Sequence, residues 1–184
     1  GLPIFSGHGL GVTRNISYPA GLSWTPSGLL FAESASHRIR RLDANGNVTT
    51  VAGSGSMGFG GDGGSALAAK LSNPTHAIQD ARGNIYIADR ANCRVRKVDP
   101  SGTITTFAGL PEGSSLPCGR TGDNGPANAA KLNGPSALAL DPQQQNLYIV
   151  DSLAVVIRRV NLDSGYIYHV AGTGFPGDSG DGGP

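Results

Sequence analysis

The chain has 184 residues, enough for one domain with a buried core and too few for two. Its 29 glycines, 12 prolines and few charges favour many turns over long helices and indicate an all-β fold. Its 14 basic and 13 acidic residues give a net charge of +1 without a basic block, so nucleic acid is not an implied partner. No apolar run approaches the ~20 residues that span a bilayer.

The chain repeats one unit three times. The copies span residues 16–53, 71–109 and 132–172, with Pro19, Pro74 and Pro135 at the same point of each. Glycine-rich connectors follow the copies at residues 54–70, 110–131 and 173–184. We therefore expect residues 1–184 to form a single repeat domain.

Within each copy, turn signals separate four short segments rich in apolar and β-branched residues. In the second copy these segments are residues 75–79, 85–88, 94–98 and 104–108. Segments of this length, bounded by Gly, Pro, Asn and Asp, are typical of strands. Four consecutive antiparallel strands in a repeated unit predict the blade of a β-propeller. A solenoid is the alternative, although these repeats are long for one.

Alternation along the third segment of each copy predicts which side chains face neighbouring blades. The apolar positions are Ile39, Leu42, Val95, Val98, Ile157 and Val160. We expect these residues to pack between blades, and Arg40, Arg96 and Arg158 to reach solvent. Because an isolated blade exposes both of its faces, three blades alone should be marginally stable unless something caps them.

The segment NPTHAIQDARGNIYIADRANCRVRKVDPSGTITTFAG and the following connector GDNGPANAAKLNGP resemble the NHL-repeat family of β-propellers. The resemblance covers nearly the whole chain, because motif positions recur in register in all three copies. It implies an all-β propeller of NHL type with three four-stranded blades, part of a six-bladed disc. Most such propellers bind proteins, peptides, glycans or RNA through a disc face, and a minority are enzymes.

The family pattern places an acid and an arginine five residues apart in a blade. These residues are Glu33 and Arg38 in the first copy and Asp89 and Arg94 in the second. A hairpin between the second and third strands would bring them together, so we expect structural ion pairs that brace the blades. In the third copy Val156 replaces the arginine, so Asp151 is either compensated by Arg158 or free.

The histidines give little support for a catalytic site. A catalytic metal needs about three protein ligands, and only His76 stands near the start of an inner strand, where Gly21 and Ala137 stand in the other copies. His76 is therefore a candidate channel-facing contact, and we assign no catalytic, cofactor or metal residues. The connector acids Asp62 and Asp123 are too few for calcium, and we expect them to bond backbone in glycine turns.

Cys93 and Cys118 are the two cysteines of the chain. Cys93 lies in the turn between the second and third strands of its blade, and Cys118 lies in extra residues of the next connector. These loops emerge on the same side of a propeller, so we expect a disulfide. By closing 24 intervening residues it would add roughly 3 kcal/mol of stability. Two free thiols in a reducing compartment are the alternative.

Two sequons are consistent with an oxidising compartment. Asn15 lies before the first copy and Asn47 follows a hairpin turn, and both contexts suit glycosylation. Together with the disulfide, they favour an extracellular or secreted protein.

These features predict a non-catalytic extracellular scaffold, without a cofactor, for protein or glycan binding or for structural assembly. Its partners would be a protein or glycan, further copies of itself, or the remaining blades of the propeller. The alternative is a propeller-type lyase or hydrolase whose catalytic residues lie mainly in other blades. FSG at residues 5–7 and GDGGP at residues 180–184 resemble parts of the repeat, so we expect a piece of a longer propeller.

Overall fold

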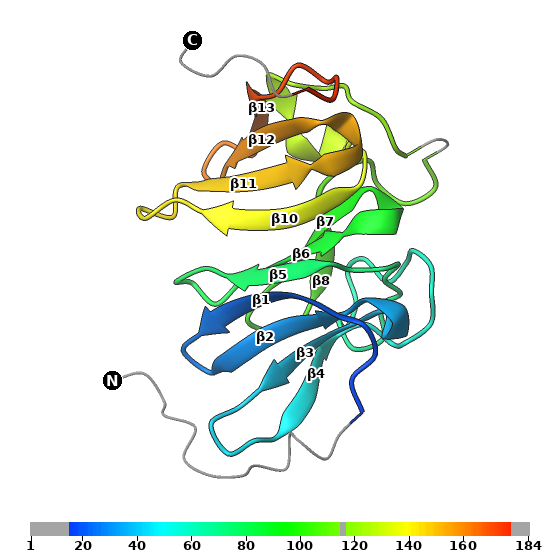
Figure 1. Cartoon of the computed structure of the whole chain (residues 1–184), viewed down its shortest axis with the longest axis vertical. Helices are drawn as coiled ribbons and strands as arrows, with labels where there is room; N and C mark the ends of the chain where they lie inside the picture. Colours follow the sequence, from blue (N-terminus) through cyan, green and yellow to red (C-terminus); the bar gives the residue numbers. More distant parts are fainter. Residues whose placement is uncertain (1–14, 115–116, 178–184) are drawn as a thin grey trace.

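The computed structural model describes residues 15–114 and 117–177, and nearly all of the regular structure in these ranges is β-strand. The strands of these ranges form three antiparallel sheets that lie side by side as propeller blades (Figure 1). The expected all-β propeller fold is confirmed. No helix in the described ranges is long and apolar enough to cross a membrane. The terminal FSG and GDGGP segments lie outside the described residues.

Each blade is a meander of consecutive strands. Blade 1 contains β1 (Pro19–Thr25), β2 (Gly28–Glu33), β3 (Arg38–Leu42) and β4 (Val48–Ala52). Blade 2 contains β5 (His76–Gln79), β6 (Ile85–Asp89), β7 (Arg94–Val98) and β8 (Ile104–Ala108). Blade 3 contains β10 (Pro135–Leu140), β11 (Asn146–Asp151), β12 (Val156–Asn161) and β13 (Tyr166–Ala171). The strands of blade 2 begin and end within about one residue of the predicted segments.

A single 3-10 turn joins the second and third strands of every blade. These turns are η2 (Ser34–Ser36), η3 (Arg90–Asn92) and η5 (Ser152–Ala154). Each turn ends at a residue in the left-handed conformation, which reverses the chain into the third strand. The other two turns of each meander therefore lie at the opposite end of the blade.

Blade 3 differs from the expected four strands because its connector adds a fifth. β9 (Gly125–Pro126) pairs with β13 at the outer edge of the sheet, just before the 3-10 turn η4 (Ala127–Ala129). The preceding connector approaches blade 2 in the same way, through an isolated bridge between Ser65 and Thr103. Each connector thus covers an outer strand edge that would otherwise expose unpaired backbone groups.

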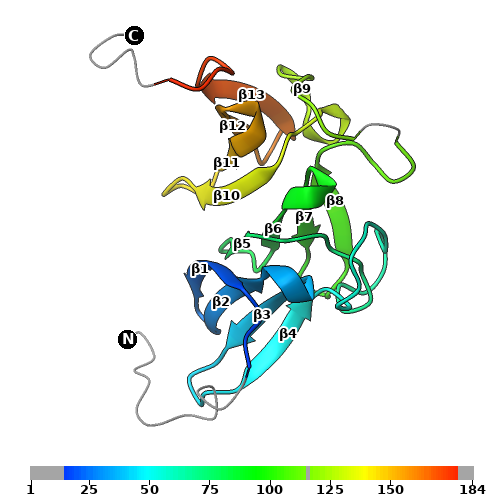
Figure 2. The ribbon, with the colours of Figure 1, turned by 45° about the vertical axis from the view of Figure 1, so that its right-hand side comes forward.

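The blades fan out from their inner strands. β1, β5 and β10 lie next to one another, whereas the outer strands β4, β8 and β13 spread apart (Figure 2). Two hydroxyls link the inner strands across the blade boundaries: Ser23 donates to the carbonyl of Ala77, and Thr75 donates to the carbonyl of Ser136. The inner end of the fan is therefore held by polar contacts as well as by packing.

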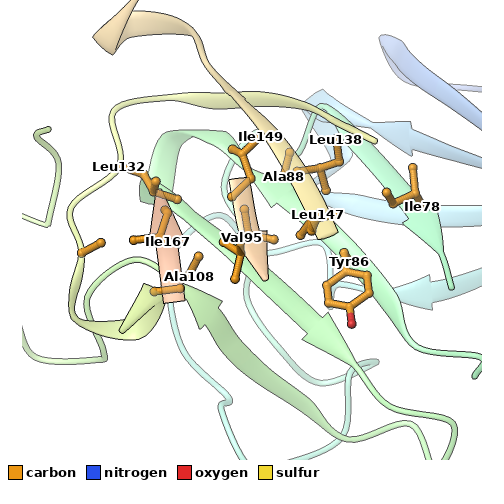
Figure 3. Packing of buried hydrophobic residues seen from close by; sticks show 13 residues of the cluster. Ile78, Tyr86, Ala88, Val95, Ala108, Leu132, Leu138, Leu147, Ile149 and Ile167 are labelled. Carbon is orange, nitrogen blue, oxygen red and sulfur yellow. The ribbon is translucent and has the colours of Figure 1, made fainter. Parts of the chain in front are cut away.

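Hydrophobic clusters fill both junctions between blades. The cluster between blades 1 and 2 includes Leu30, Ile39, Leu71, Ile87 and Ile104. The cluster between blades 2 and 3 includes Tyr86, Val95, Leu132, Leu147 and Ile149 (Figure 3). Leu71 and Leu132, which directly follow the two connectors, are fully buried, as are the connector residues Ala69 and Ala130 in the same clusters. Each connector is therefore part of the core that joins two blades.

We expect Leu71→Ala to lower the free energy of unfolding by about 2–5 kcal/mol, because it leaves a cavity between blades 1 and 2. Leu67, four residues earlier in the connector, is 56% exposed and provides the matched control. Leu67→Ala should change stability by less than about 0.5 kcal/mol. Urea unfolding followed by circular dichroism measures both variants, and equal losses of stability would contradict the packing role of Leu71.

Candidate functional site: connector clamps and inter-blade grooves

A buried arginine links the connector to blade 2. Arg96 on β7 is 0% exposed and lies between two acids. Its Nη2 contacts Oδ1 of connector residue Asp62 at 2.6 Å, and its Nη1 lies 3.5 Å from Oδ2 of Asp89 at the end of β6. The guanidinium also donates to the carbonyls of Gly60 and Lys70. One side chain thus fixes the path of the connector across the blade that follows it.

Blade 3 repeats this arrangement. Arg158 is also 0% exposed, and its Nε donates to Oδ1 of Asp123 at 2.9 Å. It donates further to the carbonyls of Thr121 and Lys131, and its Nη1 lies 3.7 Å from Oδ2 of Asp151. Arg158 therefore compensates Asp151, which was one of the two alternatives for this copy. We call each set of connector acid, third-strand arginine and second-strand acid a connector clamp.

The ion pairs involve a different arginine from the predicted one. In blade 1, Glu33 pairs with Arg40 at 2.8 Å rather than with Arg38, and in blade 2, Asp89 pairs with Arg96 rather than with Arg94. Asp89 and Arg94 do stand directly opposite in the strand register, but Arg96 is the diagonal neighbour on the same face. Its long side chain reaches back to the acid.

Arg94 binds the backbone of the segment that leaves its own blade. Its guanidinium donates to the carbonyls of Asn92, Leu110 and Pro111, and lies 3.8 Å from the ring centre of Phe59. The equivalent Arg38 in blade 1 donates to the carbonyl of Ser54. These arginines therefore anchor the start of a connector instead of bracing the hairpin.

The prediction that the third-strand arginines reach solvent is also wrong. Arg96 and Arg158 are fully buried, and the side chain of Arg40 is only 20% exposed. Alternation predicts the face of a strand on which a residue stands, but a connector that folds back over that face removes it from water.

Burial raises the pKa of Asp89 to about 6. Hydrogen bonds from the Ser72 N–H at 2.7 Å and from Nδ2 of Asn92 at 2.8 Å oppose this rise, as does Arg96. Burial likewise raises the pKa of Asp151 to about 6. Its Oδ2 accepts no hydrogen bond, and Ala154 stands where blade 2 has Asn92.

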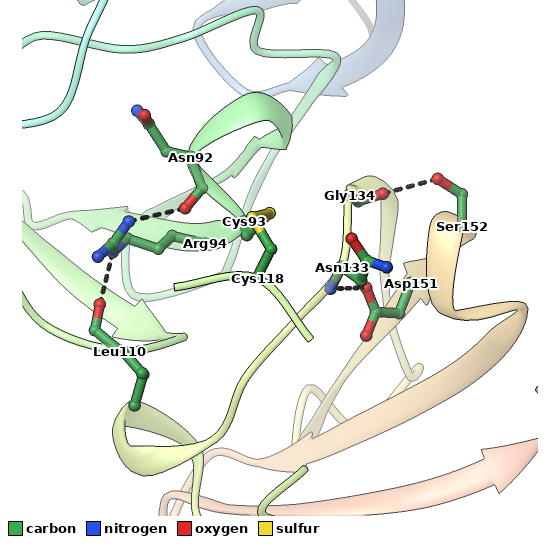
Figure 4. Close-up of a disulfide and its surroundings, with 9 residues drawn as sticks. All are labelled: Asn92, Cys93, Arg94, Leu110, Cys118, Asn133, Gly134, Asp151 and Ser152. Atoms are coloured by element: carbon green, nitrogen blue, oxygen red, sulfur yellow. Dashed lines mark hydrogen bonds between the residues drawn. A yellow bond between two sulfur atoms is a disulfide. The ribbon is translucent and has the colours of Figure 1, made fainter. Parts of the chain in front are cut away.

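Cys93 and Cys118 form a disulfide in the structure, with their Cα atoms 5.2 Å apart (Figure 4). Cys93 follows η3 and is buried, and Cys118 forms an isolated bridge with Leu132, the first residue after the connector. The bond therefore ties the long second connector to blade 2, beside the carbonyls that bind Arg94. It closes the one connector that carries extra residues.

His76, the candidate channel-facing residue, contacts the inner strands on both sides of its own. Its Nδ1 accepts a hydrogen bond from the Leu138 N–H of β10 at 3.0 Å, and its Nε2 lies 3.4 Å from the Leu22 carbonyl of β1. Burial lowers the pKa of His76. A Cβ at Gly21 would lie 2.3 Å from the Thr75 carbonyl, so the glycine aligned with His76 allows β1 and β5 to approach this closely.

The two sequon asparagines are exposed. Asn47 lies in the turn between β3 and β4, where its Nδ2 donates to Oδ2 of Asp43 at 2.9 Å. An N-linked glycan would leave one hydrogen on this nitrogen, so glycosylation is compatible with the turn. Asn15 precedes β1 and lies outside the strands.

Two grooves between blades are features that sequence reasoning missed. The groove between blades 1 and 2 has a volume of about 770 Å³ and is lined by residues that include Arg41, Gln79 and Ser101. The groove between blades 2 and 3 is smaller, about 340 Å³, and its lining includes Arg82 and Lys97. Both lie at the end of the blades opposite the disulfide, beside turns such as that between β5 and β6. No sequence signal marks them, because each depends on how two blades are placed.

The raised pKa of Asp89 predicts the direction of a pH effect on stability. The folded-state value, about 6, lies above that of an unfolded aspartate, about 3.9. Between these values the folded protein holds a proton that the unfolded chain has lost, so stability should fall as the pH rises from about 4 to about 6. Asp89→Asn cannot ionise and should remove up to about 3 kcal/mol of this fall.

Urea unfolding at several pH values measures this effect. Burial also raises the pKa of Asp151, so part of the fall remains in the variant. Hydrogen bonds lower the pKa values of Asp43 and Asp99, so the titration of these two acids affects stability only at more acidic pH. If the free energy of unfolding changes with pH in the same way in the original chain and in Asp89→Asn between pH 4 and 6, Asp89 loses its proton at lower pH and the prediction is wrong.

Solved propeller structures share this fold. A Bacteroides thetaiotaomicron protein of unknown function matches 85% of this chain and 36% of its own, with a TM-score of 0.62 at 22% identity. Streptogramin B lyase matches 85% and 41% with a TM-score of 0.55 at 14% identity. The nidogen/laminin complex matches 85% and 49% with a TM-score of 0.58 at 16% identity. At these identities the likeness concerns the fold alone.

Sequence relatives identify the family. Chicken (Gallus gallus) teneurin-1 is 32% identical over 144 residues, and mouse (Mus musculus) teneurin-4 is 30% identical over 142 residues. These matches cover 71% and 73% of this chain but only 5% of each relative. The family model for the teneurin NHL domain matches residues 55–176. The NHL resemblance is confirmed, and the chain belongs to the teneurin NHL domain family.

Proposed function

We propose that this propeller is a non-catalytic, extracellular scaffold that forms part of a longer protein and binds a protein or glycan partner. The observation that carries the scaffold role is the bonding of His76. Both ring nitrogens of this inner-strand histidine contact the backbone of neighbouring blades. The residue that was the best candidate for a channel-facing polar contact therefore links the inner strands of neighbouring blades.

Other titratable groups support the same role. The buried acids Asp89 and Asp151 lie beside arginines of the connector clamps. Residues 15–114 and 117–177 contain no group of three or more His, Cys, Asp or Glu side chains that could hold a metal ion. A metal-dependent lyase or hydrolase would need metal ligands from outside these residues, and the likeness to streptogramin B lyase concerns only the fold.

The disulfide supports the extracellular location. Disulfides persist in oxidising compartments and are rare in the cytosol of most organisms. Cys93 is buried and its partner lies in a connector that the bond ties down, which indicates a structural bridge rather than a reactive pair. The exposed Asn15 and Asn47 would accept glycans in the same compartment.

The exposed faces of the outer blades support a longer propeller. Val150 and Ile157 of blade 3 are 38% and 39% exposed. In the repeat they align with Ala88 and Val95 of blade 2, which are fully buried against blade 3. We assign the open face of blade 3 to a further blade of the same kind, because the aligned residues Ala88 and Val95 of blade 2 are covered by such a blade.

Expression of the 184-residue chain behind a secretion signal tests this proposal. We expect a protein with an oxidised Cys93–Cys118 pair, whose intact mass rises by two hydrogens on reduction. We also expect a mass decrease on treatment with an N-glycosidase, and no decrease for the double variant Asn15→Gln and Asn47→Gln. Free thiols together with unmodified sequons would contradict the extracellular assignment.

The binding role needs a separate measurement on the same secreted chain. A multivalent form of the chain should bind to cell surfaces. Pretreatment of the cells with protease should remove the binding if the partner is a protein, and pretreatment with glycosidases should remove it if the partner is a glycan. Reduced and alkylated chain serves as the control for folding. Binding that survives both pretreatments, or no binding at all, would contradict a protein or glycan partner.

A further inference from the structure

We propose that the groove between blades 1 and 2 binds a carboxylated sugar, with the guanidinium of Arg41 pairing with the carboxylate and Gln79 accepting a hydrogen bond from a ring hydroxyl. The inference rests on the proposed binding role and names both the ligand class and the site. It concerns a surface distinct from the connector clamps and from the disulfide.

The groove has the size and lining of a site for a small polar ligand. Its volume of about 770 Å³ falls within the ~300–1,000 Å³ typical of ligand pockets. β4 and the turn between β7 and β8 form its walls, together with the connector that precedes blade 2. Hydroxyl-bearing residues line it on each of these elements: Thr49, Thr50, Ser65, Ser101 and Thr103. Side-chain hydroxyls and backbone groups at several points suit a polyhydroxyl ligand.

Arg41 is the unpaired cation of the groove. Its neighbour Arg40 pairs with Glu33, whereas no acid lies within ion-pair distance of Arg41 among the described residues. Burial lowers the pKa of Arg41, and its Nε has no hydrogen-bond partner. The acid that lines the same groove, Asp99, already accepts hydrogen bonds within its own turn. A carboxylate from outside would supply the missing partner, because a guanidinium binds it through paired hydrogen bonds.

Gln79 provides a hydrogen-bond acceptor that calls for a hydroxyl group on the ligand. Its Nε2 donates to the Gly83 carbonyl at 3.1 Å, which fixes the orientation of the amide. Its Oε1 is then a buried acceptor without a hydrogen-bond partner. An ionised carboxylate cannot donate to this oxygen, whereas a hydroxyl can. Neighbouring groups cover the oxygen, so the hydroxyl reaches it after a side-chain rotation of the kind that is common on binding.

One ligand that carries both a carboxylate and hydroxyls can pair with Arg41 and donate to Gln79. This favours a uronic or related acidic sugar over a simple anion. The same strand position in the other blades lacks this combination. Arg159 of blade 3 stacks on Tyr168 at 5.0 Å, and Lys97 of blade 2 lines the smaller groove of about 340 Å³. We therefore assign the site to the first groove.

Titration of D-glucuronate into the ¹⁵N-labelled chain tests the proposal, with glucose, acetate and N-acetylglutamate titrated in parallel. We expect glucuronate to bind most tightly and to shift the amide signals of Ser101 and Gly102 in the groove. Arg41→Gln should weaken binding about tenfold or more, and Arg41→Lys by less, since lysine keeps the charge without the fork. Gln79→Leu should weaken glucuronate binding but leave acetate binding unchanged.

Arg90→Gln is the matched control, because it removes the same charge from η3 at the other end of blade 2. It should bind glucuronate as the original chain does. No saturable binding, or equal losses in Arg41→Gln and Arg90→Gln, would overturn the site. If acetate binds as tightly as glucuronate, the groove is only an anion site and the sugar is overturned as its ligand. Tighter binding of N-acetylglutamate would overturn the sugar in favour of an acidic peptide.

These outcomes separate the inference from the function on which it rests. A chain that is secreted with its disulfide and binds cell surfaces, yet does not bind glucuronate, keeps the proposed function and loses only this site. Retention of native amide dispersion in every variant shows that a loss of binding is not a loss of folding.

Discussion

The contact between the carboxylate of Asp62 and the guanidinium of Arg96 is the interaction on which the arrangement of the blades depends. It joins the connector that leaves blade 1 to the third strand of blade 2, and Asp123 and Arg158 make the same contact one blade later. Because Arg96 and Asp89 are both fully buried, removal of Arg96 would leave the carboxylate of Asp89 without its charged partner inside the protein, and removal of Asp62 would leave Asp89 as the only acid beside Arg96 among the described residues. The clamps therefore specify where each connector lies.

A fixed connector has consequences for packing and for function. It places Leu71 and Leu132 between blades, covers the edges of β8 and β13, and so determines how far neighbouring blades stand apart. The groove that contains Arg41 is lined by both blades and by the connector, so its width follows from that spacing. Polar residues in the interior are thus used to position blades, while Arg41, which has no ion-pair partner among the described residues, and Gln79, whose Oε1 accepts no hydrogen bond, line the groove between two blades.

The repeat explains which features were predictable. The marker prolines and turn residues predicted the strands of blade 2 nearly to the residue, and the placement of two loops at one end of a meander predicted that Cys93 and Cys118 would meet. The partner of Asp89 was not predictable in the same way. Register favours Arg94, and only the path of the connector shows why Arg94 binds carbonyls while Arg96 reaches the acid. The groove required the relative placement of two blades, which no local pattern contains.

A double-mutant cycle between Asp62→Asn and Arg96→Gln tests the central claim most directly. The free energies of unfolding of the single and double variants should reveal a coupling energy of about 1–3 kcal/mol, as expected for residues in one buried charge network. Asp43→Asn lies in a turn of blade 1 and should show no coupling to Arg96→Gln. Effects of Asp62→Asn and Arg96→Gln that add within about 0.5 kcal/mol would contradict the clamp.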